Sequence, residues 1–160
     1  MIKLDMSNEV FGWSGKYEIK IKNIHTGKVR TKKFHNRLMN AAFQEIVKPL
    51  TGTAANIEIK YLALGTGTTA VTDNDAALDT EVFRVADSSL SATATGQVTS
   101  EFVVLAPEAV ATIEEIGIFC GTSATLTANV GIMMSRILWH HVKTSSEEIT
   151  FRRIDTVTRG

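Results

Sequence analysis

The stretch from Ala63 to Ala70 has the residue spacing most suggestive of chemistry in this chain. It is written ALGTGTTA, so Gly65 and Gly67 stand in a G-x-G-x-x-A pattern directly after an apolar run. In dinucleotide-binding folds such glycines let the backbone approach a pyrophosphate at the start of a helix, and an acidic residue follows about 20 positions later. Taken alone, the pattern suggests nucleotide chemistry.

The residues after this pattern argue against a bound nucleotide. Ala70 is followed by Val-Thr-Asp-Asn-Asp, which is typical of a turn and not of the body of a helix. No Gly-Lys-Ser/Thr sequence closes a P-loop, and three carboxylates would repel a phosphate: Asp73, Asp75 and Asp79. We predict instead that Gly65 and Gly67 let the chain leave a strand, with a positive φ at one of them and no phosphate-sized pocket above them.

The other reactive side chains lack partners in the sequence. The Gly12–Gly15 segment, GWSG, lacks the final spacing of a nucleophile elbow, and residues 73–79 lack the glycine and distal glutamate of an EF-hand loop. His140 and His141 would point to opposite faces of one strand, so they cannot hold one metal ion together. Cys120 is the single cysteine, has no base beside it, and is expected to be a small buried apolar residue. We therefore predict no catalytic, cofactor-binding or metal-binding residues and no enzymatic activity.

Length and composition predict one β-rich domain over residues 1–160. A domain usually has roughly 100–200 residues, and 44% of this chain is hydrophobic, which is enough for one core. The 17 basic and 17 acidic residues cancel, so the total charge gives no reason to expect nucleic acid or a membrane as partner. With no long apolar stretch, no signal-peptide opening at Met1–Asp5 and no disulfide, we expect the chain to be made in a reducing cytoplasm.

The charges are unevenly distributed along the chain. Residues 16–37 hold eight basic side chains against Glu18 alone, and residues 73–115 hold nine acidic side chains against Arg84 alone. Basic side chains of the first segment form a candidate assembly surface that would dock on an acidic neighbour: Lys20, Lys22, Lys28, Arg30 and Lys32. Two alternatives are that the segments pair within one chain or are simply solvated. A groove for single-stranded nucleic acid is disfavoured, because the apolar residues beside the lysines are needed for a core.

Arg84 is expected to form an ion pair, because it is the one base in the acidic segment. Its candidate partners are Glu81, Glu114 and Glu115. We hypothesise that Arg84 and Glu115 join the long loop after residue 65 to a sheet, since a buried pair fixes geometry more reliably than it adds stability.

Hydrophobic periodicity predicts an antiparallel β-sandwich or a barrel-like domain with one helix. Residues 16–35 alternate around the turn signal His25-Thr26-Gly27, as in a basic β-hairpin. An amphipathic helix is expected over residues 37–48, with Asn36 as its N-cap, a wide apolar stripe from Leu38 to Leu50, and its end before Pro49. Strands are expected at 57–64, 81–86, 97–105, 111–119, 132–142 and 148–154, with 88–95 as an edge strand or a linker and turns at Gly96 and Gly121.

Four segments in sequence order resemble structural proteins of tailed bacteriophages, of the tail-fibre and baseplate type. They are IKYLALGTGTTAVTDNDAALDTEVFR at 59–84, IEEIGIF at 113–119, SRILW at 135–139 and KTSSEEITF at 143–151. The resemblance as a whole covers roughly residues 36–154. The resemblance implies a β-rich virion component that works as a homo-oligomer, often a trimer, and it carries over no catalytic residue. Gly117, within IEEIGIF, joins Gly65 and Gly67 as a glycine expected to have a structural or turn role.

The sequence thus predicts a phage structural protein of the tail, baseplate or fibre attachment, located in the virion after synthesis in the host cytoplasm. Its expected partners are further copies of itself and other phage structural proteins, without a nucleic-acid, membrane or small-molecule partner. A head fibre, a collar protein and a capsid-decorating protein are alternatives within the virion. A small carbohydrate- or surface-binding module is an alternative of another class, with Trp13, Tyr17 or Trp139 as its aromatic platform.

Overall fold

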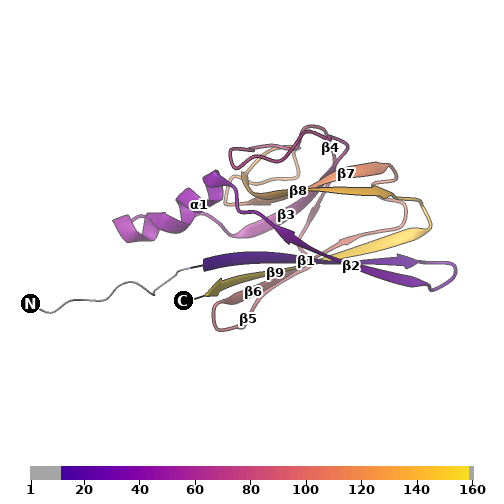
Figure 1. The fold of residues 1–160 in the computed structure, drawn as a ribbon, viewed down its shortest axis with the longest axis horizontal. Coiled ribbons are helices and arrows are strands. Elements are labelled where there is room, and N and C mark those ends of the chain that lie inside the picture. Colours follow the sequence, from indigo (N-terminus) through magenta and orange to yellow (C-terminus); the bar gives the residue numbers. More distant parts are fainter. Residues whose placement is uncertain (1–11, 159–160) are drawn as a thin grey trace, which may run out of the picture.

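The chain folds into two antiparallel sheets that pack face to face, as the computed structural model of residues 12–158 shows (Figure 1). The five-stranded sheet has the order β2-β1-β9-β6-β5, and its strands are β1 (Gly12–Asn23), β2 (Val29–Asn36), β5 (Ser89–Ala94), β6 (Gln97–Val104) and β9 (Glu147–Thr158). The four-stranded sheet has the order β4-β3-β7-β8, and its strands are β3 (Ile59–Gly65), β4 (Glu81–Ala86), β7 (Thr112–Cys120) and β8 (Ile132–Val142). The predicted β-sandwich is confirmed, and the sheets do not close into a barrel.

The main core lies between the sheets and follows the period-2 alternation of the strands. In β1, the inward residues Tyr17, Ile19 and Ile21 are all at most 2% exposed, while the three lysines of the strand are exposed. Phe102 and Phe151, which are paired across β6 and β9, are fully buried in the same cluster. These side chains pack against the apolar inner face of the four-stranded sheet, which includes Leu62, Leu64, Ile116 and Ile118.

A second apolar cluster covers the outer face of the four-stranded sheet. It contains Met39, Ala63, Leu78, Phe119, Ala124 and Met133. Leu78 and Ala124 belong to the loops 66–80 and 121–131, so these two loops cover the sheet in place of a third layer. Burial on both faces explains why β3 and β7 read as nearly continuous apolar runs.

The helix is shorter than the sequence predicts, and its cap differs. The structure has α1 (Asn40–Val47) followed by the 3₁₀ helix η1 (Lys48–Thr51), which contains Pro49. Asn36 is the last residue of β2 and no N-cap; the cap is Met39, which makes no side-chain capping bond. Leu38 forms a β-bridge with Ser135, and the Met39 N–H bonds Met134, so the backbone stays extended up to residue 39.

The apolar stripe of the helix is only half used. Met39 and Ala42 are buried, whereas Phe43 is 49% exposed and Leu50 is 86% exposed. Within residues 12–158, no helix is long and apolar enough to cross a membrane.

Truncating Phe151, one member of the buried pair with Phe102, should test the sandwich core. We expect Phe151→Ala to lower the free energy of unfolding by about 3–5 kcal/mol, because it leaves a cavity between the sheets. Urea unfolding would measure this difference. Leu50→Ala is the control and should change stability by less than about 0.5 kcal/mol, because its side chain faces solvent. Equal effects of the two variants would contradict this assignment of the core.

Candidate functional site

A buried ion network attaches the loop 66–80 to the four-stranded sheet. Arg136 on β8 has only 1% of its side chain exposed and donates to Glu115 Oε2 on β7 at 2.8 Å. The same guanidinium donates to Asp75 at 2.8 Å and to Asp79 at 3.1 Å. A further bond reaches the carbonyl of Thr69. One arginine therefore holds three carboxylates and a carbonyl of the loop and sheet in fixed positions.

Glu115 is fully buried and accepts from the loop as well as from Arg136. Its carboxylate accepts the backbone N–H groups of Gly67 at 3.0 Å, Asp79 at 3.2 Å and Thr80 at 3.0 Å. A buried carboxylate is tolerated when its oxygens are paired in this way. The loop backbone and Arg136 together supply that pairing.

This geometry corrects the expectation for Gly65 and Gly67. Neither glycine has a positive φ; among residues 12–158, the glycines that do are Gly27, Gly52, Gly96, Gly121 and Gly131. A Cβ at Gly65 or Gly67 would instead collide with the Glu115 carboxylate, which lies directly over both positions. The Gly67 N–H, the kind of donor that would face a phosphate, already bonds a negatively charged group. These glycines therefore allow a close approach and no unusual backbone angle.

Gly117 lies in the middle of β7 and not at a turn. It stands opposite Arg136 in the strand register. A Cβ there would lie 3.0 Å from Leu78 Cδ2, so the missing side chain makes room for the loop residue that covers the sheet. Its role is structural, through packing.

The expected Arg84–Glu115 pair does not form. Arg84 is buried and makes a two-point ion pair with Glu81 at 2.7 and 2.8 Å, which was one of the alternatives. Its third nitrogen donates to the carbonyls of Thr125 and Val130 in the loop 121–131, and its guanidinium lies 4.0 Å from the centre of the Phe119 ring. Two arginines on strands therefore attach loops to the four-stranded sheet. Arg136 holds the loop 66–80, and Arg84 holds the loop 121–131.

A third buried arginine lies on the inner face of the five-stranded sheet. Arg153 on β9 is fully buried and donates to Ser135 at 2.7 Å and to Asp155 Oδ1 at 2.8 and 3.2 Å. Its guanidinium also lies 5.7 Å from the ring centres of Trp13 and Tyr17. The second oxygen of Asp155, Oδ2, is buried and has no hydrogen-bond partner within residues 12–158.

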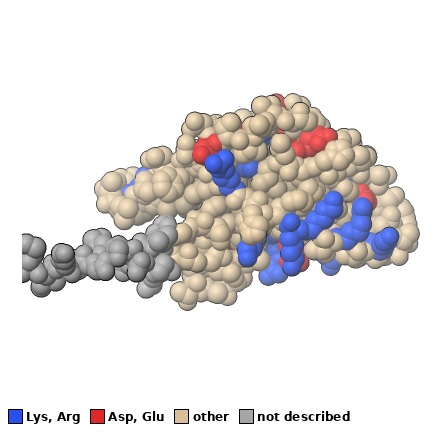
Figure 2. All heavy atoms as spheres, viewed as in Figure 1, with Lys and Arg blue, Asp and Glu red and all other residues tan. Residues whose placement is uncertain are grey.

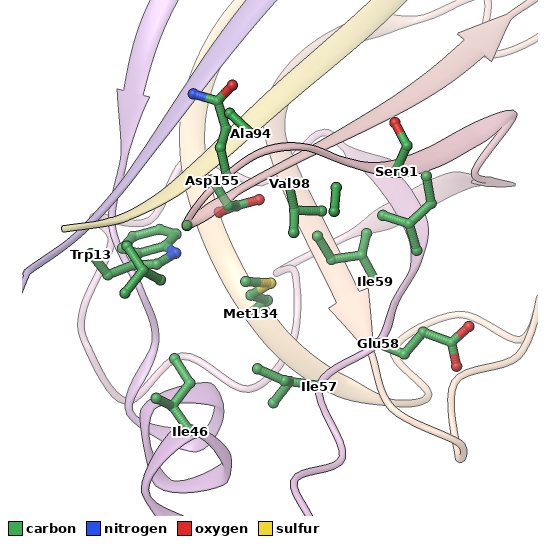
Figure 3. A pocket seen from close by; sticks show the side chains of 15 residues that line it. Trp13, Ile46, Ile57, Glu58, Ile59, Ser91, Ala94, Val98, Met134 and Asp155 are labelled. Atoms are coloured by element: carbon green, nitrogen blue, oxygen red, sulfur yellow. The ribbon is translucent and has the colours of Figure 1, made fainter.

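An open cavity of about 620 Å³ lies beside this cluster, at the end of the sandwich near α1 (Figure 3). Its walls come from both sheets and the helix: Trp13 of β1, Ile46 of α1, Ile59 of β3, Val98 of β6 and Met134 of β8. Most of the lining is apolar. Asp155 is one of the few polar side chains in it, and Figure 3 shows its carboxylate among Trp13, Val98 and Met134.

The candidate assembly surface divides between two faces of the hairpin. Lys20 and Lys22 lie on the outer face of β1. Figure 2 shows basic side chains gathered in the region of the β1–β2 hairpin. The register pairs Arg30 with Ile21 and Lys32 with Ile19, so both lie on the inner face of the edge strand β2. Arg30 pairs there with Glu147 at 2.8 Å, and Lys28 follows the hairpin turn. The five side chains therefore do not form one patch.

The two charged segments also meet within the chain. Arg37 pairs with Asp73 at 2.6 Å, although both side chains are about half exposed and the pair adds little stability. Asp75 and Asp79 of the acidic segment pair instead with Arg136, which lies outside the basic segment. Intrachain pairing, one of the alternatives from the sequence, accounts for part of the charge pattern.

The histidines and the cysteine occupy ordinary positions. His140 is exposed and lies 2.8 Å from Glu114, while His141 is buried and lies 3.0 Å from Glu147 on the other face of β8. Burial raises the pKa of the Cys120 thiol to about 12, so it is protonated at neutral pH. In the part of the chain that the structure describes, no group of three or more His, Cys, Asp or Glu side chains is placed to hold a metal ion.

Sequence reasoning missed the buried cations that organise these sites. Arg136, Arg153 and Lys143 are each at most 2% exposed, although two of them sit in strand segments that the sequence predicted. Lys143 donates to the carbonyls of Leu105 and Ala106 at 3.1 and 3.0 Å. The available signal was the single arginine inside the apolar run Ser135–Trp139, because a charge at a core position needs a partner.

Comparison of the chain with protein-family models, curated proteins and solved structures gives no match.

Removing the arginine of the loop network should destabilise the fold strongly. We expect Arg136→Met to lower the free energy of unfolding by about 3–5 kcal/mol, because it leaves Glu115 charged, buried and without its cation. The double variant Arg136→Met/Glu115→Gln should lose less than the sum of the two single changes. Chemical denaturation of all three variants measures this coupling. Arg152→Met, at a half-exposed arginine 3.8 Å from Glu101, is the control with an effect below about 0.5 kcal/mol. Additive effects at Arg136 and Glu115 would refute the network.

The same network should make stability fall in acid. Burial raises the pKa of Asp75, but hydrogen bonds from Thr72 and Arg136 outweigh it and leave that pKa below its usual value. Hydrogen bonds from Thr69 and the charge of Arg136 lower the pKa of Asp79. Groups with lowered folded pKa values stabilise the fold above the usual aspartate pKa of about 3.9, and this contribution is lost as the pH falls through the folded values.

We therefore expect the melting temperature of the native chain to drop between pH 5 and pH 2 by more than that of Asp75→Asn/Asp79→Asn. The double variant should already be less stable at pH 7. Thermal unfolding followed by circular dichroism across this pH range is the measurement. Parallel pH profiles for the two proteins would contradict the assignment.

Proposed function

We propose that this chain is a non-enzymatic structural protein of a tailed-bacteriophage virion, an oligomeric assembly module of the tail, baseplate or fibre attachment. The observation that carries the proposal is where the phage-like segments lie. Residues 59–84 form β3, the loop 66–80 and the start and body of β4, while 113–119 lie in β7 and 135–139 in β8. Three of the four segments, far apart in the sequence, thus make up one sheet and the loop attached to it. The fourth, 143–151, runs into β9 of the other sheet.

The residues inside those segments are the ones that fix the geometry of this sheet. Gly65, Gly67 and Asp79 come from the first segment, Glu115 and Gly117 from the second, and Arg136 from the third. Their contacts are mutual, since Glu115 bonds both Gly67 and Arg136. The resemblance therefore covers residues that depend on one another in space, which supports a shared architecture more strongly than four separate short matches do.

The surface suits repeated contacts between subunits. The outer face of β1 presents Lys20 and Lys22 on a regular sheet, and the edge strand β5 is exposed along its whole length. An exposed sheet edge offers unpaired backbone groups to a neighbour, and a charged flat face gives an interface orientation and specificity. Both features fit a homo-oligomer with closed symmetry, for which the phage-like segments favour a trimer.

The alternative of a carbohydrate-binding module finds less support. Of its three candidate platform residues, Tyr17 is 1% exposed and Trp139 is 3% exposed. Trp13 is half-buried and lines the cavity. A head fibre, a collar protein and a capsid-decorating protein share the same structural expectations as the proposed tail module, and virion fractionation separates them.

Reversing the charge of the β1 face should test the assembly proposal. By light scattering, the purified chain should have a mass that is a multiple of 17.5 kDa, with three copies favoured. Lys20→Glu/Lys22→Glu should shift this mass toward one copy, because it replaces attraction to an acidic partner surface by repulsion. Lys48→Glu/Lys60→Glu changes the net charge by the same amount away from that face and should keep the oligomer.

Binding to virion parts completes this test. The native chain should co-sediment with purified tails or baseplates of a phage that encodes it, and antibodies should label that part of the particle. A stable monomer that binds no virion component would refute the proposal, and labelling of the head would favour the alternatives within the virion.

A further inference from the structure

We propose that residues 2–7 of a neighbouring copy of this chain add a strand to the free edge of β5 and place their apolar side chains in the cavity beside α1. This inference rests on the assembly role proposed above, and it names the segment that joins one copy to the next. Three observations carry it: an uncharged sheet edge, an apolar cavity beside that edge, and the alternating sequence of residues 2–7, which precede the part of the chain that the structure describes.

The edge formed by β5 lacks the residues that usually protect a sheet edge. β5 is the end strand of the five-stranded sheet, and all six of its residues are exposed. Charged residues and prolines at a free edge normally keep other strands from pairing with it. The opposite edge strand, β2, carries Arg30, Lys32 and Lys33, whereas β5 reads SLSATA and has neither a charge nor a proline. Pairing with another chain is therefore left open at β5.

β5 also forms one wall of the cavity, and this wall consists of short side chains. Ala92 and Ala94 line the cavity, and Ala92 pairs with Val98, another lining residue. Figure 3 shows Ala94 and Val98 on one side of the space, with Ile46 and Ile57 on the other. The space of about 620 Å³ between them is left unfilled. A strand added beside β5 would present every second side chain on this same face of the sheet, so large apolar side chains there would enter the cavity.

Residues 2–7, IKLDMS, have the pattern that such a strand needs. Ile2, Leu4 and Met6 are large and apolar, and the residues between them are polar. This alternation is typical of a strand with one buried face, and six residues match the length of β5. When a segment adds to a sheet edge, main-chain hydrogen bonds supply affinity and the alternate side chains supply specificity. A second β5 would fit this edge less well, because it would bring alanines to a wall that already consists of alanines.

The distance to β1 favours a neighbouring copy over the same chain as the source of this strand. In the order β2-β1-β9-β6-β5, a strand added beside β5 lies four spacings from β1, which is about 19 Å. The six steps from Met6 to Gly12 reach about 20–22 Å at full extension, so almost no length remains for passing the β5–β6 turn at Gly96. Within one chain the added strand would also run parallel to β5. A neighbour's segment has neither restriction, and it can form the antiparallel pairing that is more stable per residue.

Disulfide crosslinking of full-length chains tests this pairing. One version of the chain carries Ala92→Cys, and a second version, made larger by a C-terminal tag, carries Ile2→Cys, Leu4→Cys or Met6→Cys. The two versions are produced together and oxidised. We expect a covalent dimer of the two versions at one or more of the three positions, because facing residues of adjacent strands have Cα atoms about 4.5–5.5 Å apart, which is within disulfide reach.

The odd-numbered positions of the segment are the matched controls. Lys3→Cys and Asp5→Cys should lose most of the crosslink to Ala92→Cys, because successive side chains of a strand point to opposite faces. The native chain is the blank, since its Cys120 is buried. Equal yields at odd and even positions, or no crosslink at any even position, would overturn the proposal. So would a disulfide within one chain when Leu4→Cys and Ala92→Cys are combined in it.

A second pair of variants tests the apolar face of the segment. Leu4→Asp/Met6→Asp should shift the mass in solution toward the 17.5 kDa of one copy, because carboxylates would have to enter an apolar cavity. Lys3→Asp/Ser7→Asp introduces the same side chains on the opposite face and should keep the oligomer. An unchanged mass for Leu4→Asp/Met6→Asp would count against the exchange. A native oligomer whose cysteines do not link would reject this inference alone, whereas a native monomer would reject the assembly proposal as well.

Discussion

The carboxylate of Glu115 is the constraint on which the outer half of this structure depends. A charge that is buried in the middle of a sheet is costly unless every oxygen is paired. The fold meets this requirement by bringing Arg136 from the neighbouring strand and three backbone N–H groups from the loop 66–80. The loop adopts its path because the carboxylate needs those donors, and the glycines at positions 65 and 67 are needed because the carboxylate lies so close. The resemblance of residues 65–70 to a nucleotide-binding motif therefore results from the glycines that make room for the Glu115 carboxylate.

Much of the sandwich could be predicted from the sequence, because alternation of apolar and polar residues reports directly which face of a strand is buried. The bounds of β4 and β8 agree with the predicted ranges, and the uncertain tract 88–95 contains the edge strand β5. The start of the helix was wrong because a single bridge between Leu38 and Ser135 keeps the chain extended past Asn36. That bridge joins residues almost one hundred positions apart, so the helix propensity of the local sequence cannot predict it.

The partners of the charged residues were harder to predict than the strands. Arg136 stands opposite Gly117 and diagonally across from Glu115, a relation that depends on the register of β7 and β8 and on the irregularity between Ile113 and Glu115. Diagonal neighbours on one face interact strongly when their side chains are long. Without the register, Arg84 had three candidate partners, Glu81, Glu114 and Glu115, and nothing in the sequence separated the correct one, Glu81, from the hypothesised Glu115. The lysines of the hairpin show the same limit, since one shared segment supplies side chains to two opposite faces.

The arginine-fixed loops also determine where this scaffold would accept foreign sequence. By its length, the loop 66–80 would be an obvious place to insert a peptide tag. Its backbone N–H groups, however, donate to the buried Glu115 carboxylate, so added residues there would remove these hydrogen bonds. The turn at His25–Gly27 is different: its amides at positions 25 and 26 bond the Asn23 side chain, and no side chain of the core or of the buried networks comes from it. The hairpin turn at residues 25–27 is therefore the better place to insert a display epitope, because the loop 66–80 is needed to stabilise the four-stranded sheet.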